Sequence, residues 1–199
     1  MAEQTGQHGL RVLLVDENRG RSALLEQALS DAGYHVIAKV ITSDNLAHQV
    51  RLHQPDVIIV DLESPDRDTL EHMHSISRDQ PRPIVMFAED QDSESIHKAI
   101  KAGVSAYIVD GLSSKRVKPV MEVAIARFRE YQALRDELAQ TKISLEERKL
   151  VDRAKALLIK QQKMSEEEAH QALRKLAMDQ GKKLGEVARS VIAILDILG

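Results

Sequence analysis

Acidic side chains stand at the ends of two short apolar runs in the N-terminal half of the chain. Asp16 and Glu17 follow the run Arg11–Val15. Asp61 follows the run Val57–Val60. Because the carboxyl ends of parallel strands meet at one edge of a sheet, we expect these carboxylates to converge. Oxygen ligands of this kind suit Mg²⁺, which keeps several of its waters. The alternative is a set of solvated acids at strand ends.

A parallel sheet is needed to position these acids, and the first half of the chain has the pattern of one. Short runs rich in β-branched residues alternate with segments of helical periodicity, which is typical of strands joined by crossover helices. The expected strands are Arg11–Val15, His35–Val40, Val57–Val60, Ile84–Phe87 and Ala106–Val109, and the expected helices cover about 21–32, 44–53, 68–79 and 93–102. The sequence therefore predicts a doubly wound α/β domain with a five-stranded parallel sheet.

A long helix should follow, because all five prolines lie at or before Pro119 and no glycine occurs between Gly111 and Gly181. From Val117 to about Gln162 the pattern is helical with hardly a break. Apolar residues at three-four spacing among charged ones are typical of a coiled-coil seam. The seam residues are Tyr131, Leu134, Leu138 and Leu145, with a less suitable Thr141 between them. We expect a parallel homodimer; the alternative is a solvated linker helix.

Three helical segments are expected at the C-terminus, over about 145–162, 166–180 and 184–198. The second follows Ser165, and Glu168 stands three residues later, which predicts a capping box. The third should pack on the other two, because it carries a broad apolar stripe. The stripe consists of Leu184, Val187, Ala188, Val191, Ile192, Leu195 and Leu198.

Composition excludes several classes of protein. No apolar run approaches the roughly 20 residues that span a bilayer, and the polar start is no secretion signal, so we expect a cytoplasmic protein. Zero cysteines exclude disulfides and thiolate sites. The chain also lacks a Gly-rich phosphate loop and a nucleophile motif, so we expect no enzyme. His72 and His74 are two residues apart on an expected helix and should be solvated on different faces.

The acidic pattern resembles that of the CheY-like receiver domains of response regulators, and Asp61 aligns with their phosphoacceptor. Tyr107 in the expected fifth strand fits this resemblance, which covers about residues 9–125. Ala88 stands where the family carries a Ser or Thr that hydrogen-bonds the phosphoryl group. Asp110 stands where the family carries a lysine, and a carboxylate there repels phosphate. We therefore expect that Asp61 phosphorylation is absent or is not the switch, and that Mg²⁺ is a possible but not a required ligand of the pocket.

The C-terminal third resembles the ANTAR domain of bacterial antitermination regulators, and the whole chain resembles the NasT and AmiR class. The matching pieces are Arg148-Lys149, Val151–Lys155, Glu168–His170, Leu173-Arg174, Ala177-Met178, Glu186–Ala188 and Val191-Ile192. The implied division is a disordered N-terminus (1–8), a receiver-like domain (9–125), a coiled-coil linker (126–144) and a three-helix ANTAR domain (145–199). The resemblance implies binding to paired hairpins of leader mRNA so that a terminator hairpin cannot form. It also implies restraint by a partner sensor protein, within two-component or phosphorelay signalling.

The charge distribution agrees with a nucleic-acid partner for the C-terminus. From Thr141 onward, 12 Lys and Arg against 9 Asp and Glu give 12 − 9 = +3, whereas residues 1–140 carry 16 − 22 = −6. The candidate phosphate contacts are Arg148, Lys149, Arg153, Lys155, Arg174 and Lys175. His170 and Met178 are candidates for base contact, although a packing role explains each of them more simply. No aromatic residue follows Tyr131, so aromatic stacking on bases is excluded.

Two other functions remain open. A DNA-binding response regulator would need a recognition helix, but the second C-terminal helix opens with three glutamates and the third carries only Arg189 as a base. A protein-interaction module is the other alternative, in which the helical tail binds a protein. Structured RNA, duplex DNA and a protein partner as ligands would separate the three.

Overall fold

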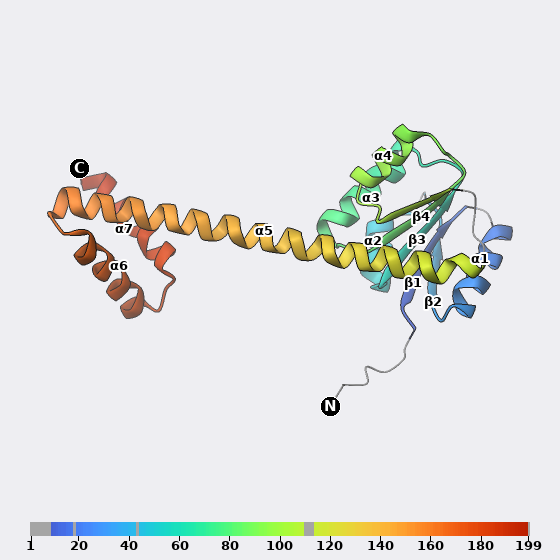
Figure 1. Ribbon diagram of the computed structural model, residues 1–199, viewed down its shortest axis with the longest axis horizontal. Coiled ribbons are helices and arrows are strands. Elements are labelled where there is room, and N and C mark those ends of the chain that lie inside the picture. Colours follow the sequence, from blue (N-terminus) through green and yellow to red (C-terminus); the bar gives the residue numbers. More distant parts are fainter. Residues whose placement is uncertain (1–8, 18, 43, 110–113, 199) are drawn as a thin grey trace, which may run out of the picture. The chain divides into compact units, whose positions relative to one another are not determined.

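The computed structural model describes residues 9–17, 19–42, 44–109 and 114–198. The chain divides into two compact units, Met1–Tyr131 and Gln132–Gly199. The boundary between them falls inside one helix, α5 (Ser114–Gln162), which contributes to both (Figure 1). The expected disordered segment 1–8 and the expected pocket residue Asp110 lie outside the described residues.

The first unit is built on a five-stranded parallel sheet in the order β2-β1-β3-β4-β5, as the sequence predicted. β2 and β5 have the predicted bounds, whereas the other three strands continue one or two residues further, to Asp16, Leu62 and Ala88. The strands are β1 (Arg11–Asp16), β2 (His35–Val40), β3 (Val57–Leu62), β4 (Ile84–Ala88) and β5 (Ala106–Val109).

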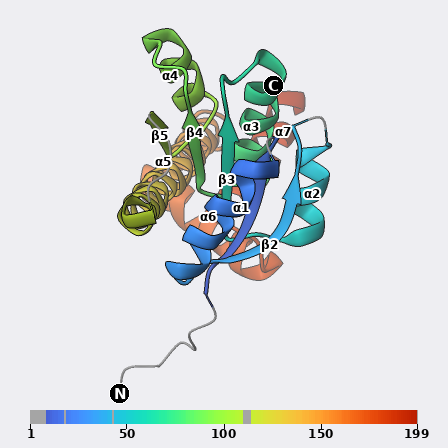
Figure 2. The same cartoon turned by 90° about the vertical axis from the view of Figure 1, so that its right-hand side faces the viewer.

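Helices cover both faces of this sheet. α2 (Leu46–His53), α3 (Arg67–Asp79) and α4 (Ser93–Lys101) lie on one face, and α1 (Arg19–Asp31) and the start of α5 lie on the other (Figures 1 and 2). The reason is the alternation of side chains along each strand. In β1, Leu13 and Val15 pack against the first group of helices, while Val12 and Leu14 pack against the second.

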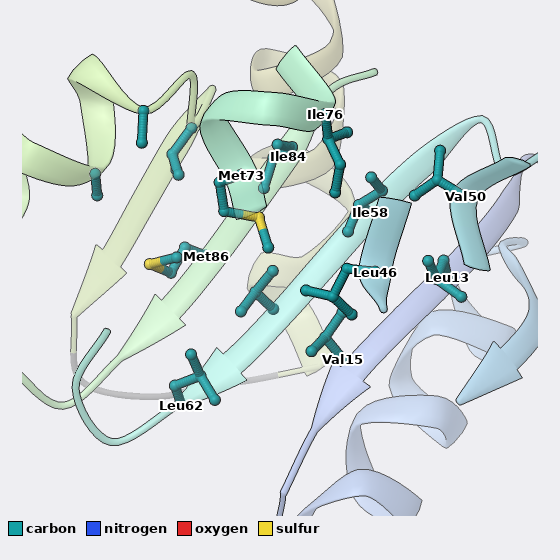
Figure 3. Packing of buried hydrophobic residues seen from close by; sticks show 14 of the residues in the cluster. Leu13, Val15, Leu46, Val50, Ile58, Leu62, Met73, Ile76, Ile84 and Met86 are labelled. Atoms are coloured by element: carbon teal, nitrogen blue, oxygen red, sulfur yellow. The ribbon is translucent and has the colours of Figure 1, made fainter. Parts of the chain in front are cut away.

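The core under α2, α3 and α4 is closely filled with branched and flexible apolar side chains (Figure 3). Met73 and Ile76 of α3 meet Ile58 and Ile84 of the two central strands, and all four are fully buried. Burial of each such side chain contributes about 1.5–3 kcal/mol. This packing fixes β3 and β4, and with them the positions of Asp61 and Ala88.

The second unit consists of the C-terminal part of α5, α6 (Glu166–Gln180) and α7 (Leu184–Leu198). The predicted third helix is therefore present, and the predicted segment 145–162 is the uninterrupted end of α5. The core comprises Ala154, Leu173, Ala177, Val187, Ala188 and Ile192. Three of these six residues are alanines, and larger apolar side chains surround them.

Capping groups define both ends of α6, and the one at its start is as predicted. The Ser165 side chain accepts a hydrogen bond from the Glu168 amide, and the Glu168 carboxylate accepts one from the Ser165 amide, which completes the capping box. At the other end Gly181 adopts a left-handed conformation with φ of 61°, which glycine tolerates best. Within the part of the chain that the structure describes, none of the helices combines the length and the apolar character needed to cross a membrane.

Candidate functional site

Asp61 lies at the carboxyl end of the sheet beside the acid of the neighbouring strand. Asp16 of β1 and Asp61 of β3 are register partners, so their side chains extend from adjacent strands on the same face. Asp61 is buried, with 7% of its surface exposed. The predicted convergence of Asp16 and Asp61 is therefore present.

Glu17 is engaged elsewhere. Its carboxylate accepts a hydrogen bond from the Thr42 hydroxyl, on the loop after β2. Over residues 9–17, 19–42, 44–109 and 114–198, no three acidic or histidine side chains are grouped closely enough to hold a metal ion. The Mg²⁺ site expected from Asp16, Glu17 and Asp61 stays a prediction.

Ala88 ends β4 and is buried, with 3% of its surface exposed. It is the register partner of Leu62, which directly follows Asp61. A methyl group neither donates nor accepts a hydrogen bond. This position cannot respond to a phosphoryl group on Asp61 as a hydroxyl would.

The loop that follows Ala88 is tied to the loop that follows β3. The amides of Glu89 and Asp90 both donate to the carbonyl oxygen of Glu63, at 3.0 Å each. The Ser64 hydroxyl donates to Asp90 Oδ2 at 3.0 Å. The Tyr107 hydroxyl donates to the Asp90 carbonyl oxygen at 2.9 Å. Asp90 thus connects the loops after β3 and β4 with β5.

Asp90 is held in its ionised form by these neighbours. The amide of Asp92 and the hydroxyls of Ser95 and Ser64 hydrogen-bond its carboxylate and lower its pKa below the ordinary value. These hydrogen bonds therefore favour the ionised form of the Asp90 side chain.

The C-terminal unit presents a continuous outer face on α6. Ala169, Leu173 and Ala177 are the buried side of this helix. At 3.6 residues per turn, positions spaced by three and four residues lie together on the opposite side. Gln171, Arg174, Lys175 and Met178 are exposed on this outer side, together with Glu167, which stands four residues before Gln171.

Met178 is 79% exposed, so the simpler expectation that it packs in the core is wrong. Arg174 and Lys175 form no ion pair with any described residue of the chain. Gln171 was not expected on this face from the sequence, although it lies three, four and seven residues before Arg174, Lys175 and Met178. His170 is half-buried, in agreement with a partial packing role.

Two of the expected phosphate contacts form ion pairs with other helices. Lys155 of α5 donates to Glu166 of α6 at 3.0 Å, it pairs with Asp152 at the same distance, and its side chain is only 17% exposed. Hydrogen bonds to Asp152 and then to Glu166 raise the pKa of Lys155. Arg153 pairs with Asp196 of α7 at 2.9 Å. In contrast, Arg148 and Lys149 are exposed on α5.

The predicted seam on α5 is exposed in the single chain. Leu134, Leu138 and Leu145 are 59%, 55% and 52% exposed, and Tyr131 is exposed as well. An apolar row of this length on a helix surface favours a covered state.

Comparison with known proteins agrees with the two units. Residues 12–120 match the model of the response regulator receiver domain, and residues 139–192 match that of the ANTAR domain. The chain belongs to the response regulators with an ANTAR domain. The ANTAR domain implies RNA binding, which agrees with the charge of this unit.

Individual relatives of this response regulator support the assignment. It is 32% identical over 185 residues to the transcriptional regulatory protein PdtaR of Mycobacterium tuberculosis, covering 93% of this chain and 90% of PdtaR. It is also 39% identical over 85 residues to the nitrate regulatory protein of Klebsiella oxytoca, covering 43% of this chain and 22% of that protein. The chain is thus a transcriptional regulator of the PdtaR and NasT-like type.

Among solved structures, the fold is similar to the receiver domain of a modulated diguanylate cyclase from Desulfovibrio desulfuricans. The TM-score is 0.54 at 21% identity, over 62% of this chain and 98% of the other. This likeness concerns the receiver fold alone.

Proposed function

We propose that this response regulator binds paired hairpins in a leader mRNA through its ANTAR unit and thereby prevents formation of a terminator hairpin. The observation that carries the proposal is the outer face of α6. There, Arg174 and Lys175 are exposed without carboxylate partners among the described residues, and the exposed Met178 lies one turn away. Cations placed in this way can bind phosphates. A methionine side chain can pack on an unstacked loop base because it is flexible and polarisable.

The contacts of the other basic side chains support a smaller set of proposed RNA contacts. Arg148 and Lys149 on α5 remain candidates, since both are exposed. Lys155 is assigned to the fold, because releasing it for a phosphate would leave Glu166 and Asp152 without their partner. Arg153 has an intermediate position, since its pair with Asp196 is largely solvent-exposed and contributes little to stability.

Control through a partner sensor protein, more than through Asp61 phosphorylation, is part of the proposal. The methyl group of Ala88 and the tie between Ser64 and Asp90 both support it, because they leave the loop after β4 without a phosphate-dependent contact. Treatment with acetyl phosphate should leave Asp61 without a stable label and RNA affinity unchanged. A stable label that raises RNA affinity would assign the switch to Asp61 after all.

We further propose that two copies pair through the seam of α5, with Leu134 and Leu138 at its centre. Their exposure in the single chain supports this pairing. A dimer would also offer one ANTAR unit to each hairpin of a pair, which raises the effective affinity for paired sites.

The test is binding of the full-length protein to a leader RNA with two hairpins, at a fixed salt concentration near 0.15 M. The competitors are the same stems with scrambled loops, and duplex DNA. We expect binding that depends on the loop sequences and that weakens when Met178→Ala is introduced. Equal affinity for all three nucleic acids would contradict hairpin recognition, and preference for duplex DNA would favour a conventional DNA-binding regulator.

A further inference from the structure

A groove of about 640 Å³ opens between helices α3 and α4 of the receiver unit. Arg67, Leu70 and His74 line it from α3, where their spacing of three and four residues places them on one face. Lys98 and Lys101 line it from α4, again three residues apart. The two helices lie on the face of the sheet that α5 does not cover (Figure 2).

The groove combines an apolar floor with a cationic rim. Leu70 is partly buried against the core, and Ala102 beside it is buried. Three Lys and Arg side chains surround this floor, whereas Glu71 is the single acidic residue among the residues that line the groove. This local excess of positive charge lies in a segment, residues 1–140, whose net charge is −6 from 16 basic and 22 acidic side chains.

The cations differ in their availability. Arg67 is paired with Glu71 at 2.7 Å, and Lys98 with Glu94 at 2.8 Å. Lys101 has no carboxylate partner in the described part of the chain. His74 is exposed beside the same groove and can add a donor. Lys101 is therefore the cation that an incoming anion would meet first.

We propose that this groove binds a small organic anion, which places an apolar body on Leu70 and Ala102 and its carboxylate, phosphate or sulfonate group against Lys101 and His74. The size of the groove supports this class of ligand, because small-molecule sites commonly enclose about 300–1,000 Å³. A protein partner is less well matched. Stable protein interfaces use about 20–30 residues on each side, far more than the nine that line this groove.

The test uses 8-anilino-1-naphthalenesulfonate, an aryl sulfonate with the required chemistry, and the full-length protein. Binding is followed by fluorescence, and the site is located from amide shifts in the ¹⁵N spectrum. We expect saturable binding with shifts at Leu70, Ser95 and Lys101. Lys101→Glu should weaken it by about fivefold to tenfold, because it replaces an attraction at the rim with a repulsion of similar size. His74→Glu should act in the same direction.

The matched control is Lys118→Glu, which makes the same charge change at an exposed position of α5 away from the groove. Equal affinities of the Lys101→Glu and Lys118→Glu proteins would overturn the proposal. So would amide shifts confined to Leu134 and Leu138, which would place the probe on the seam. A third outcome is that an acidic helical peptide shifts the amides of the groove and the sulfonate does not. That result would overturn the small-ligand proposal and favour a protein partner.

Discussion

Removal of the two unpaired cations on α6 should change how strongly RNA binding depends on salt. Each phosphate contact contributes about 0.7–0.9 to the slope of log K against log salt concentration. Arg174→Ala combined with Lys175→Ala should therefore lower that slope by about 1.4–1.8. Between 50 and 200 mM salt, the factor by which the wild-type affinity falls should be roughly 7 to 12 times the factor for the double variant.

The comparison variant is Lys155→Met, which keeps the aliphatic stem and removes the charge. Because Lys155 is 17% exposed and holds Glu166 and Asp152, we expect its slope to equal that of the wild type. Any loss of affinity in this variant should be similar at every salt concentration, as for a slightly altered fold.

Fluorescence anisotropy with a labelled two-hairpin RNA, measured at four salt concentrations from 50 to 200 mM, gives both slopes. Circular dichroism establishes that both variants remain helical. The reasoning is refuted if Lys155→Met lowers the slope as much as the double variant does, or if the double variant leaves the slope unchanged.

Three further changes test other parts of the structure. Leu134→Glu combined with Leu138→Glu should give a monomer by light scattering. Ile143→Glu should leave the dimer intact, because Ile143 is equally exposed but lies on a different side of α5. A dimer that persists in the double variant would contradict pairing through the seam. Leu173→Ala should destabilise the C-terminal unit by about 2–5 kcal/mol, because Leu173 is part of its small core. Calorimetry should show that this unit unfolds at a temperature well below that of the receiver unit. A single transition at an unchanged temperature would contradict this role of Leu173. Hydrogen bonds from the side chain and then the amide of Thr69 lower the pKa of Asp66. The ionised carboxylate therefore stabilises the folded protein above the unfolded pKa of about 3.9, and this contribution is lost as pH falls through the lower folded pKa. Asp66→Ala should therefore cost about 1 kcal/mol at pH 7 in urea unfolding and almost nothing near pH 2, and an equal cost at both would contradict the charged cap.

The architecture could be predicted from the sequence because its signals are local. β-branched runs such as His35–Val40 and caps such as Ser165 specify elements from neighbouring residues alone. The expected strand Val57–Val60 is shorter than β3, because Asp61 is buried within the strand and the ladder continues to Leu62. A polar residue inside a buried strand cannot be distinguished from a strand end by pattern.

The sites were harder to predict because their residues meet only through the fold. Nothing near Lys155 in the sequence indicates that Glu166, eleven positions away on the next helix, will bind it. The contact of Glu17 with Thr42 likewise joins residues 25 positions apart. Met178 is a different case, because the helical spacing from Leu173 and Ala177 already placed it on the outer face. There, the general preference of methionine for cores was given too much weight.

The continuity of α5 has a consequence for attempts to take this protein apart. Val117, Met121 and Ala124 complete the sheet packing of the first unit, and Ala154 of the same helix is central to the second. No loop marks the boundary at Tyr131 and Gln132, so a protease has no exposed turn to cut there. A fragment that starts after the helix would lose part of its own core, and one that stops before the helix would expose the underside of the sheet. Gene fusions that exchange one unit for that of a relative therefore need to be joined within the helix, at matching positions of the heptad.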